Sequence, residues 1–224
     1  MFNLLNSEEK RIVEKFFHIV NERSENMFIK EANKWMGIGC VKYPTDLWNY
    51  YEIIYNLKPD VIIETGTAYG GSALFFSDMM SLCGIDRNVI TVDIEPTNRG
   101  NIGDNKGIRF LVGSSIDNDI INSISSFINK EQKIMVVLDS NHQKDHVLNE
   151  MILYSKLVTV GQYMVVEDGG INGHPVLPGW GDGPYEAIND YMRSYNNDNF
   201  KIDKSREERF VFSCFPNGWL LRIK

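Results

Sequence analysis

Several features that mark specialised classes of protein are scarce in this sequence. Only three cysteines occur, and none of them belongs to a CxxC pair; they are Cys40, Cys83 and Cys214. An odd number of isolated cysteines is typical of reduced thiols and argues against a disulfide framework. We therefore expect a cytoplasmic protein.

Long apolar runs and basic runs are missing as well. No uninterrupted apolar stretch approaches the roughly 20 residues that span a bilayer, and the first residues lack the order of a signal peptide. Lysine and arginine number 23 against 30 acidic residues, so the formal net charge is −7. This balance argues against binding to the phosphate backbone of nucleic acids. We expect neither a membrane nor a nucleic acid as a partner.

The 224 residues are enough for one large domain with a short appendage. Residues 1–58 are expected to be helical, with Ser7 as a helix N-cap. Residues 35–55 are rich in aromatic side chains, so the first 58 residues are predicted to form a helical cap or a contact within a homo-oligomer. Residues 59–224 are predicted to form the main domain.

From residue 59 onward, short apolar runs alternate with stretches that have helical patterning. The predicted strands are residues 61–64, 89–93, 109–112, 134–139 and 163–167, and the predicted helices are residues 72–82, 116–128, 145–157 and 185–195. This alternation predicts an α/β fold with a mostly parallel sheet and helices on both faces.

The C-terminal part changes character. Residues 210–215 and 219–223 flank Pro216-Asn217-Gly218, and a turn between two apolar runs predicts an antiparallel hairpin. By analogy, a parallel sheet completed by such a hairpin is the class I methyltransferase variation of the Rossmann-like fold.

A glycine-rich turn follows the first predicted strand of the sheet and reads Glu64-Thr65-Gly66-Thr67-Ala68-Tyr69-Gly70-Gly71-Ser72. Glycines there permit a tight turn and a close approach of a cofactor before the next helix begins. The order is neither the GxGxxG of a dinucleotide site nor a phosphate loop. Taken alone, the turn could be a packing device.

Asp93 ends the second predicted strand, where an acid can hold the ribose hydroxyls of a nucleoside. Together with the glycine turn, it indicates a nucleoside-type cofactor. Gly113-Ser114-Ser115 follows the third strand and could line the adenine, although Ser115 could equally cap the following helix.

Three carboxylates follow the fourth and fifth predicted strands: Asp139, Glu167 and Asp168. If the two strands are neighbours, these groups converge, repel one another and are costly to desolvate. A hard divalent cation would resolve that conflict, and oxygen ligands favour Mg²⁺ or Mn²⁺ over Zn²⁺. A solvated acidic rim is the alternative.

Two histidines follow Asp139 closely. His142 is predicted to reach a metal-bound hydroxyl, and an ordinary histidine pKa suits proton removal near neutral pH. His146 is expected to be a structural helix residue. Residues 169–183 hold six glycines and two prolines, which favours a functional lid or substrate wall.

Taken together, these motifs resemble the cephalosporin-hydroxylase-type family of S-adenosylmethionine-dependent methyltransferases and its relatives that O-methylate sugars on macrolides. The stretches that match are residues 58–60, 64–73, 92–93, 113–115, 138–142, 145–147, 161, 165–168, 183–184 and 216–218. The resemblance covers the chain from about Trp35 to its C-terminus.

The resemblance implies an O-methyltransferase that moves a methyl group from S-adenosylmethionine to a hydroxyl of a sugar or sugar-containing small molecule, with Mg²⁺. Asp139, Glu167 and Asp168 would bind the metal, and His142 and Asp139 would be catalytic. The residues expected at the cofactor are Glu64, Gly66, Thr67, Tyr69, Gly70, Ser72, Asp93, Ser114, Ser115 and Asp139.

Two other functions stay open at this point. An NAD-dependent oxidoreductase is disfavoured because the glycines are not in GxGxxG order. A non-catalytic, methyltransferase-like binding protein would keep the fold without the chemistry, and the intact acids and His142 argue against it.

Overall fold

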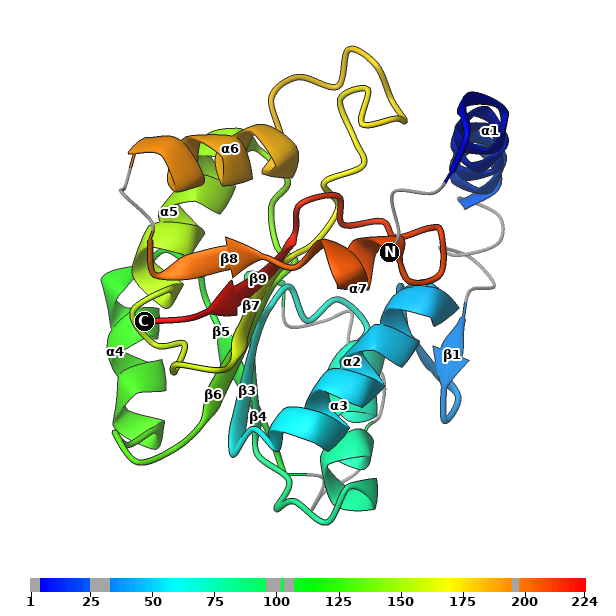
Figure 1. Cartoon of the computed structure of the whole chain (residues 1–224). Helices are drawn as coiled ribbons and strands as arrows, with labels where there is room; N and C mark the ends of the chain where they lie inside the picture. Colours follow the sequence, from blue (N-terminus) through cyan, green and yellow to red (C-terminus); the bar gives the residue numbers. More distant parts are fainter. Residues whose placement is uncertain (1–4, 25–32, 96–101, 103–106, 195–197) are drawn as a thin grey trace.

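The structure is a computed structural model that describes residues 5–24, 33–95, 102, 107–194 and 198–224. One seven-stranded sheet lies between two layers of helices (Figure 1). In the part of the chain that is described, no helix is both long enough and apolar enough to cross a membrane.

The main sheet has the strand order β5-β4-β3-β6-β7-β9-β8. Its strands are β3 (Val61–Thr65), β4 (Val89–Asp93), β5 (Ile108–Val112), β6 (Ile134–Leu138), β7 (Tyr163–Val166), β8 (Phe200–Ile202) and β9 (Trp219–Arg222). The strands from β3 to β7 are parallel, and β9 is inserted antiparallel between β7 and β8. The predicted sheet, mostly parallel with antiparallel strands at the C-terminal end, is confirmed.

The two layers of helices cover opposite faces of this sheet (Figure 1). One layer contains α2 (Pro44–Leu57) and α3 (Gly71–Leu82), and the other contains α4 (Asn118–Phe127), α5 (Lys144–Tyr154) and α6 (Pro184–Ser194). Successive residues of β3 enter different cores, since Ile63 packs with the α4–α6 layer and Ile62 with the α2–α3 layer. The central strands are therefore apolar throughout, because both faces are buried.

The first strand of the predicted C-terminal hairpin was placed wrongly. Residues 210–215 form no strand, and β9 instead pairs with β8, which lies earlier in the chain. Buried Asp46 on α2 accepts hydrogen bonds from the Ser213 hydroxyl at 2.8 Å and from the Cys214 N–H at 3.2 Å. These bonds hold the segment in a loop after α7 (Lys204–Glu208), so its apolar side chains reach the core without strand pairing.

The first 58 residues were expected to be helical, but they are not helical throughout. Between α1 (Ser7–Ser24) and α2 lies a small hairpin of β1 (Lys34–Trp35) and β2 (Ile38–Gly39). The cap of α1 is Asn6, one residue before the predicted Ser7, because the Asn6 side chain accepts the N–H groups of Glu8 and Glu9. Whether this region contacts a second copy of the chain stays a prediction.

Gly66 brings the carboxyl ends of β3 and β6 together. Its φ is +88°, and a Cβ at this position would overlap the carbonyl oxygen of Asp139. The N–H of Asp139 donates to the carbonyl of Thr65 at 3.0 Å, and the N–H of Gly66 donates to that of Val92 at 2.8 Å. The glycine turn and the start of the loop after β6 are thus in direct contact.

We expect Gly66→Ala to lower the free energy of unfolding by about 2–4 kcal/mol, because a steric overlap adds to the strain of a left-handed residue. Gly179→Ala is the matched control. Gly179 also has a positive φ, +91°, but no described atom lies within 4 Å of its virtual Cβ. Urea denaturation of both variants measures the difference, and equal losses would contradict the role given to close packing at Gly66.

Candidate active site

Three side chains meet at the carboxyl edge of the sheet, where β6 and β7 end. Nε2 of His142 lies 3.2 Å from Oδ2 of Asp168 and 3.6 Å from Oδ1 of Asp139. One ligand atom from each of the three residues lies within 4.8 Å of the others. Two carboxylates and an imidazole at this spacing form a donor set that suits a divalent cation.

Glu167 lies beside this group but is bonded on its inner side. Its Oε1 accepts a hydrogen bond from the Tyr50 hydroxyl at 2.6 Å, and its Oε2 accepts one from Nζ of Lys42 at 2.8 Å. Glu167 is buried and is not one of the three residues whose ligand atoms converge. The prediction that Glu167 lies at this edge of the sheet is confirmed. Its role as a metal ligand stays a prediction.

Lys42 and Tyr50 were missed by the reasoning from sequence. Nζ of Lys42 also lies 2.5 Å from Oδ2 of Asp139, so the ammonium group bridges Asp139 and Glu167. A single lysine in an aromatic-rich segment carries no local signal. The available clue was that clustered carboxylates need a counter-charge, and only a metal ion had been considered as its source.

The carboxylates change the protonation of His142. Burial alone would lower the pKa of its imidazole, but the charge of Asp168 and the hydrogen bond and charge of Asp139 raise it to about 9. An ordinary pKa near neutrality was expected for His142. This expectation is wrong when only the protein's own charged groups surround the imidazole. The imidazole carries a proton at neutral pH and forms an ion pair with Asp168.

A cavity of about 260 Å³ adjoins the glycine turn. Its lining residues are Gly66, Val92, Asp93, Ile94, Gly113, Ser114, Ser115, Ser140, Asn141 and His146. Four of the residues predicted to bind the cofactor are among them: Gly66, Asp93, Ser114 and Ser115. Two of the lining residues, Ser140 and Asn141, stand between Asp139 and His142 in the sequence, whereas Asp139, His142 and Asp168 are not among the lining residues.

His146 and Ser115 meet at the wall of this cavity, where His146 differs from its expected role and Ser115 follows one of its two expected roles. His146 is part of the wall and not only a structural helix residue, since its Nε2 lies 3.0 Å from Oγ of Ser115. Helix α4 has Asp117 at its N-cap position, so Ser115 lines the cavity and does not cap that helix.

Asp93 connects the end of β4 to the glycine turn. Its Oδ2 accepts the N–H of Ala68 at 2.8 Å, and its Oδ1 accepts the N–H of Glu95 at 2.9 Å. These bonds fix the carboxylate at the cavity wall. A carboxylate has about four lone-pair sites, so Asp93 retains the capacity to accept further hydrogen bonds.

Glu64 is fully buried behind the glycine turn. Its Oε2 accepts a hydrogen bond from the Thr91 hydroxyl at 2.7 Å, whereas Oε1 has no hydrogen-bond partner of good geometry among the described residues. Burial raises the pKa of this carboxyl to about 7, against the opposing charge of Lys42. A buried oxygen without a partner is costly, so Glu64 is suited to a ligand that donates to it.

The remaining residues predicted at the cofactor surround the turn without lining the cavity. Thr67 is buried, and its hydroxyl lies 2.8 Å from that of Thr91. Ser72 is buried in the first turn of α3, which Gly70 precedes with a φ of +84°. The side chain of Tyr69 is partly exposed and packs close to Gly39. Direct contact of these four residues with a cofactor stays a prediction.

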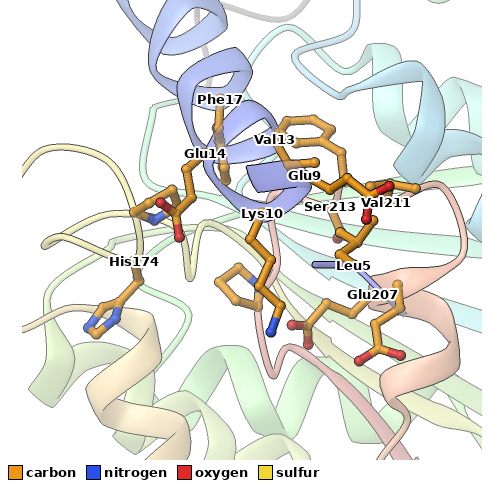
Figure 2. Close-up of a pocket in the computed structure, with 14 residues that line it drawn as sticks. Leu5, Glu9, Lys10, Val13, Glu14, Phe17, His174, Glu207, Val211 and Ser213 are labelled. Carbon is orange, nitrogen blue, oxygen red and sulfur yellow. The ribbon is translucent and has the colours of Figure 1, made fainter. Parts of the chain in front are cut away.

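Residues 169–183, the predicted lid or substrate wall, border a second cavity of about 670 Å³. Figure 2 shows this cavity between α1, the loop that contains His174 and the segment of Glu207 and Val211. Phe17 of α1 packs so closely on Gly170 that a Cβ there would contact its ring. Part of the cavity wall therefore comes from the segment that begins directly after Asp168. The role of this segment as a substrate wall stays a prediction.

Comparison with known sequences identifies relatives along nearly the whole chain. The profile described as Rhamnosyl O-methyltransferase/CmcI matches residues 27–223. A rhamnosyl O-methyltransferase of Mycobacterium tuberculosis (strain H37Rv) is 40% identical over 230 residues, which cover 95% of this chain and 92% of the relative. Its namesake in Mycobacterium leprae is 42% identical over 196 residues, covering 87% and 85%.

Solved structures share the fold. A CmcI structure with Mg and SAM superposes with a TM-score of 0.64 at 20% identity, covering 86% of this chain and 77% of that one. An O-methyltransferase from Bacillus cereus in complex with SAH gives a TM-score of 0.56 at 14% identity, covering 84% and 90%. The predicted Rossmann-like fold is thereby confirmed.

These matches also decide between the predicted classes of enzyme. An NAD-dependent oxidoreductase is not supported, and the predicted family and the predicted O-methyltransferase class are confirmed. The chain belongs to the Rhamnosyl O-methyltransferase/CmcI family.

Proposed function

We propose that this chain transfers a methyl group from S-adenosylmethionine to a hydroxyl of a sugar or sugar-containing small molecule, with Mg²⁺ or Mn²⁺ at Asp139, Glu167 and Asp168. The observation that carries the proposal is the group of Asp139, His142 and Asp168, whose intervening residues Ser140 and Asn141 line the cavity beside the glycine turn. This arrangement supports a nucleoside cofactor and a cation bound near each other at the carboxyl edge of the sheet.

The residues present fit the sulfonium cofactor. The carboxylate of buried Glu64, behind the glycine turn and hydrogen-bonded with Ser72 and Thr91, suits the ammonium group of the methionine part. Asp93 is placed where an acid binds ribose hydroxyls in folds of this kind. Ser114, Ser115 and His146 line the rest of the cavity and offer hydrogen bonds to the base.

The residues also fit a hard divalent cation. Carboxylate oxygens are preferred ligands of Mg²⁺ and Mn²⁺, and Asp139 and Asp168 present oxygens toward His142. The related CmcI structure contains Mg and SAM, and the curated relatives are named for rhamnosyl groups. These names support a sugar as the acceptor.

When bound, S-adenosylmethionine supplies an electrophilic methyl group, and a divalent cation lowers the pKa of the acceptor hydroxyl as a Lewis acid. The chain must hold the acceptor oxygen and take up its proton. Nε2 of His142 is the proposed proton acceptor, and the carboxylate of Asp168, 3.2 Å from the same nitrogen, stabilises the imidazolium that forms. A neutral imidazole requires that cationic charge offset Asp139 and Asp168, since these raise the pKa of His142.

Asp139→Asn is expected to reduce divalent-dependent methyl transfer to a rhamnoside by roughly 100-fold or more, because an oxygen ligand and its charge are lost. Binding of S-adenosylmethionine in the presence of EDTA should change by less than about tenfold, since Asp139 does not line the cavity. Methyl transfer from labelled cofactor and calorimetric titration measure the two effects. Full activity of the variant would refute the metal assignment, and binding of NADH in place of S-adenosylmethionine would refute the cofactor.

The ion pair of His142 and Asp168 predicts how stability depends on pH when a chelator is present. The pKa of His142 is raised from 6.5 to about 9 in the folded chain. The stabilisation is therefore complete below about pH 6.5 and is lost as the pH rises through about 9. The melting temperature should fall across this window in the parent chain and less steeply in His142→Gln. Parallel pH profiles for the two proteins would show that the ion pair does not contribute.

A further inference from the structure

Lys42 is the most deeply buried cation near the carboxylates of the site. Its side chain is 2% exposed, and its Nζ lies 2.5 Å from Oδ2 of Asp139 and 2.8 Å from Oε2 of Glu167. Lysine is almost never buried to this extent without a specific partner. Neither the proposed methyl transfer nor the proposed cofactor contacts assign it a task.

The ammonium group alters the charge of the site. Asp139, Glu167 and Asp168 carry three negative charges when ionised, and Lys42 offsets one of them at two of the three groups. Charge neutralisation at Asp139 and Glu167 is also what a divalent cation would provide. The chain thus supplies part of that charge from its own sequence.

The backbone of Lys42 is held in place, so this charge is a fixed part of the fold. Its N–H donates to the carbonyl of Cys40 at 2.9 Å, and its carbonyl accepts from the Asn33 side chain at 2.8 Å. Helix α2 begins two residues later, at Pro44. A long movement of Lys42 away from the carboxylates would have to break these contacts.

The oxygens of the two carboxylates are divided between the inner and outer sides of the site. Oδ2 of Asp139 faces Lys42, whereas Oδ1 lies toward His142. Both oxygens of Glu167 are bonded inside, one to Lys42 and one to Tyr50. Lys42 therefore occupies one oxygen of each carboxylate, and Tyr50 holds the second oxygen of Glu167 without adding charge.

We propose that Lys42 is a built-in counter-ion that competes with the divalent cation for Asp139 and Glu167 and so weakens the affinity of the site for metal. The inference rests on the proposed metal dependence. In this proposal, Lys42 stabilises the carboxylates before metal binds and keeps the bound metal exchangeable. Lys42 is therefore a determinant of metal affinity.

The test is Mn²⁺ binding, measured by electron paramagnetic resonance and by calorimetry without any acceptor. Lys42→Met and Lys42→Gln should bind Mn²⁺ about tenfold or more tightly than the parent chain, because a nearby positive charge has been removed. Lys42→Arg, which keeps the charge, should not. In addition, Asp139→Asn should weaken Mn²⁺ binding in the Lys42→Met background, which locates the bound ion.

Two variants serve as matched controls. Tyr50→Phe removes a hydrogen bond to Glu167 without a change in charge. Lys144→Met removes one positive charge from partly exposed ion pairs with Asp182 and Asp190, neither of which is among the three carboxylates. Both should leave the affinity for Mn²⁺ within about threefold of the parent value, since a screened surface charge contributes little.

Thermal unfolding gives an independent measurement. The neutral Lys42 variants should melt lower than the parent chain in EDTA and gain more from Mn²⁺, because the metal then replaces the missing charge. Should both neutral variants be unfolded in EDTA, the proposal requires Mn²⁺ to restore folding, and failure to do so overturns it.

The outcomes separate this inference from the proposed function. If the parent chain binds Mn²⁺ and Lys42→Met and Lys42→Gln bind it equally or more weakly, the proposed competition by Lys42 is overturned. The proposed metal site is then still supported. Mn²⁺ binding by neither the parent chain nor the variants overturns both the competition and the metal dependence. Tighter binding confined to the neutral Lys42 variants supports the inference.

Discussion

The close approach of three carboxylates at the carboxyl ends of β6 and β7, of which Glu167 is buried, is the constraint on which the site depends. A buried carboxylate is costly unless it is paired and hydrogen-bonded. Here Lys42, Tyr50 and His142 supply the partners. Two of them come from the segment before β3, so the first 58 residues complete the charged interior of the sheet, whatever further role they have as a cap or contact surface.

Helix α2 fulfils this constraint twice. Through Tyr50 it reaches Glu167 at the edge of the sheet, and through Asp46 it holds the loop at Ser213 before β9. Burial raises the pKa of the Asp46 carboxyl to about 7, although the bonds from Ser213 and Cys214 oppose the shift. One helix therefore connects the carboxyl edge of the sheet at Glu167 to the C-terminal loop, and this loop also forms part of the larger cavity beside residues 169–183.

What could be predicted from the sequence follows from the range of each interaction. Apolar runs revealed the parallel strands, and strand ends revealed Asp93, Asp139 and Asp168, because the carboxyl ends of parallel strands share one edge. Lys42 lies 97 residues from Asp139 and 125 from Glu167, and Asp46 lies 167 residues from Ser213. No local pattern encodes such pairs, so the counter-ion was missed and the loop at residues 210–215 was mistaken for a strand.

The neighbouring acids Glu167 and Asp168 have different surroundings because the direction of the backbone changes between them. Glu167 still follows the alternation of β7 and enters the interior, where Tyr50 and Lys42 bind it. Asp168 has a φ of +55°, which non-glycine residues adopt rarely and most often at functional sites, and its carboxylate lies beside His142. The sequence presents two equivalent carboxylates. In the fold, Glu167 is bonded to Lys42 and Tyr50 in the interior, whereas Asp168 lies beside His142, because the backbone turns between them.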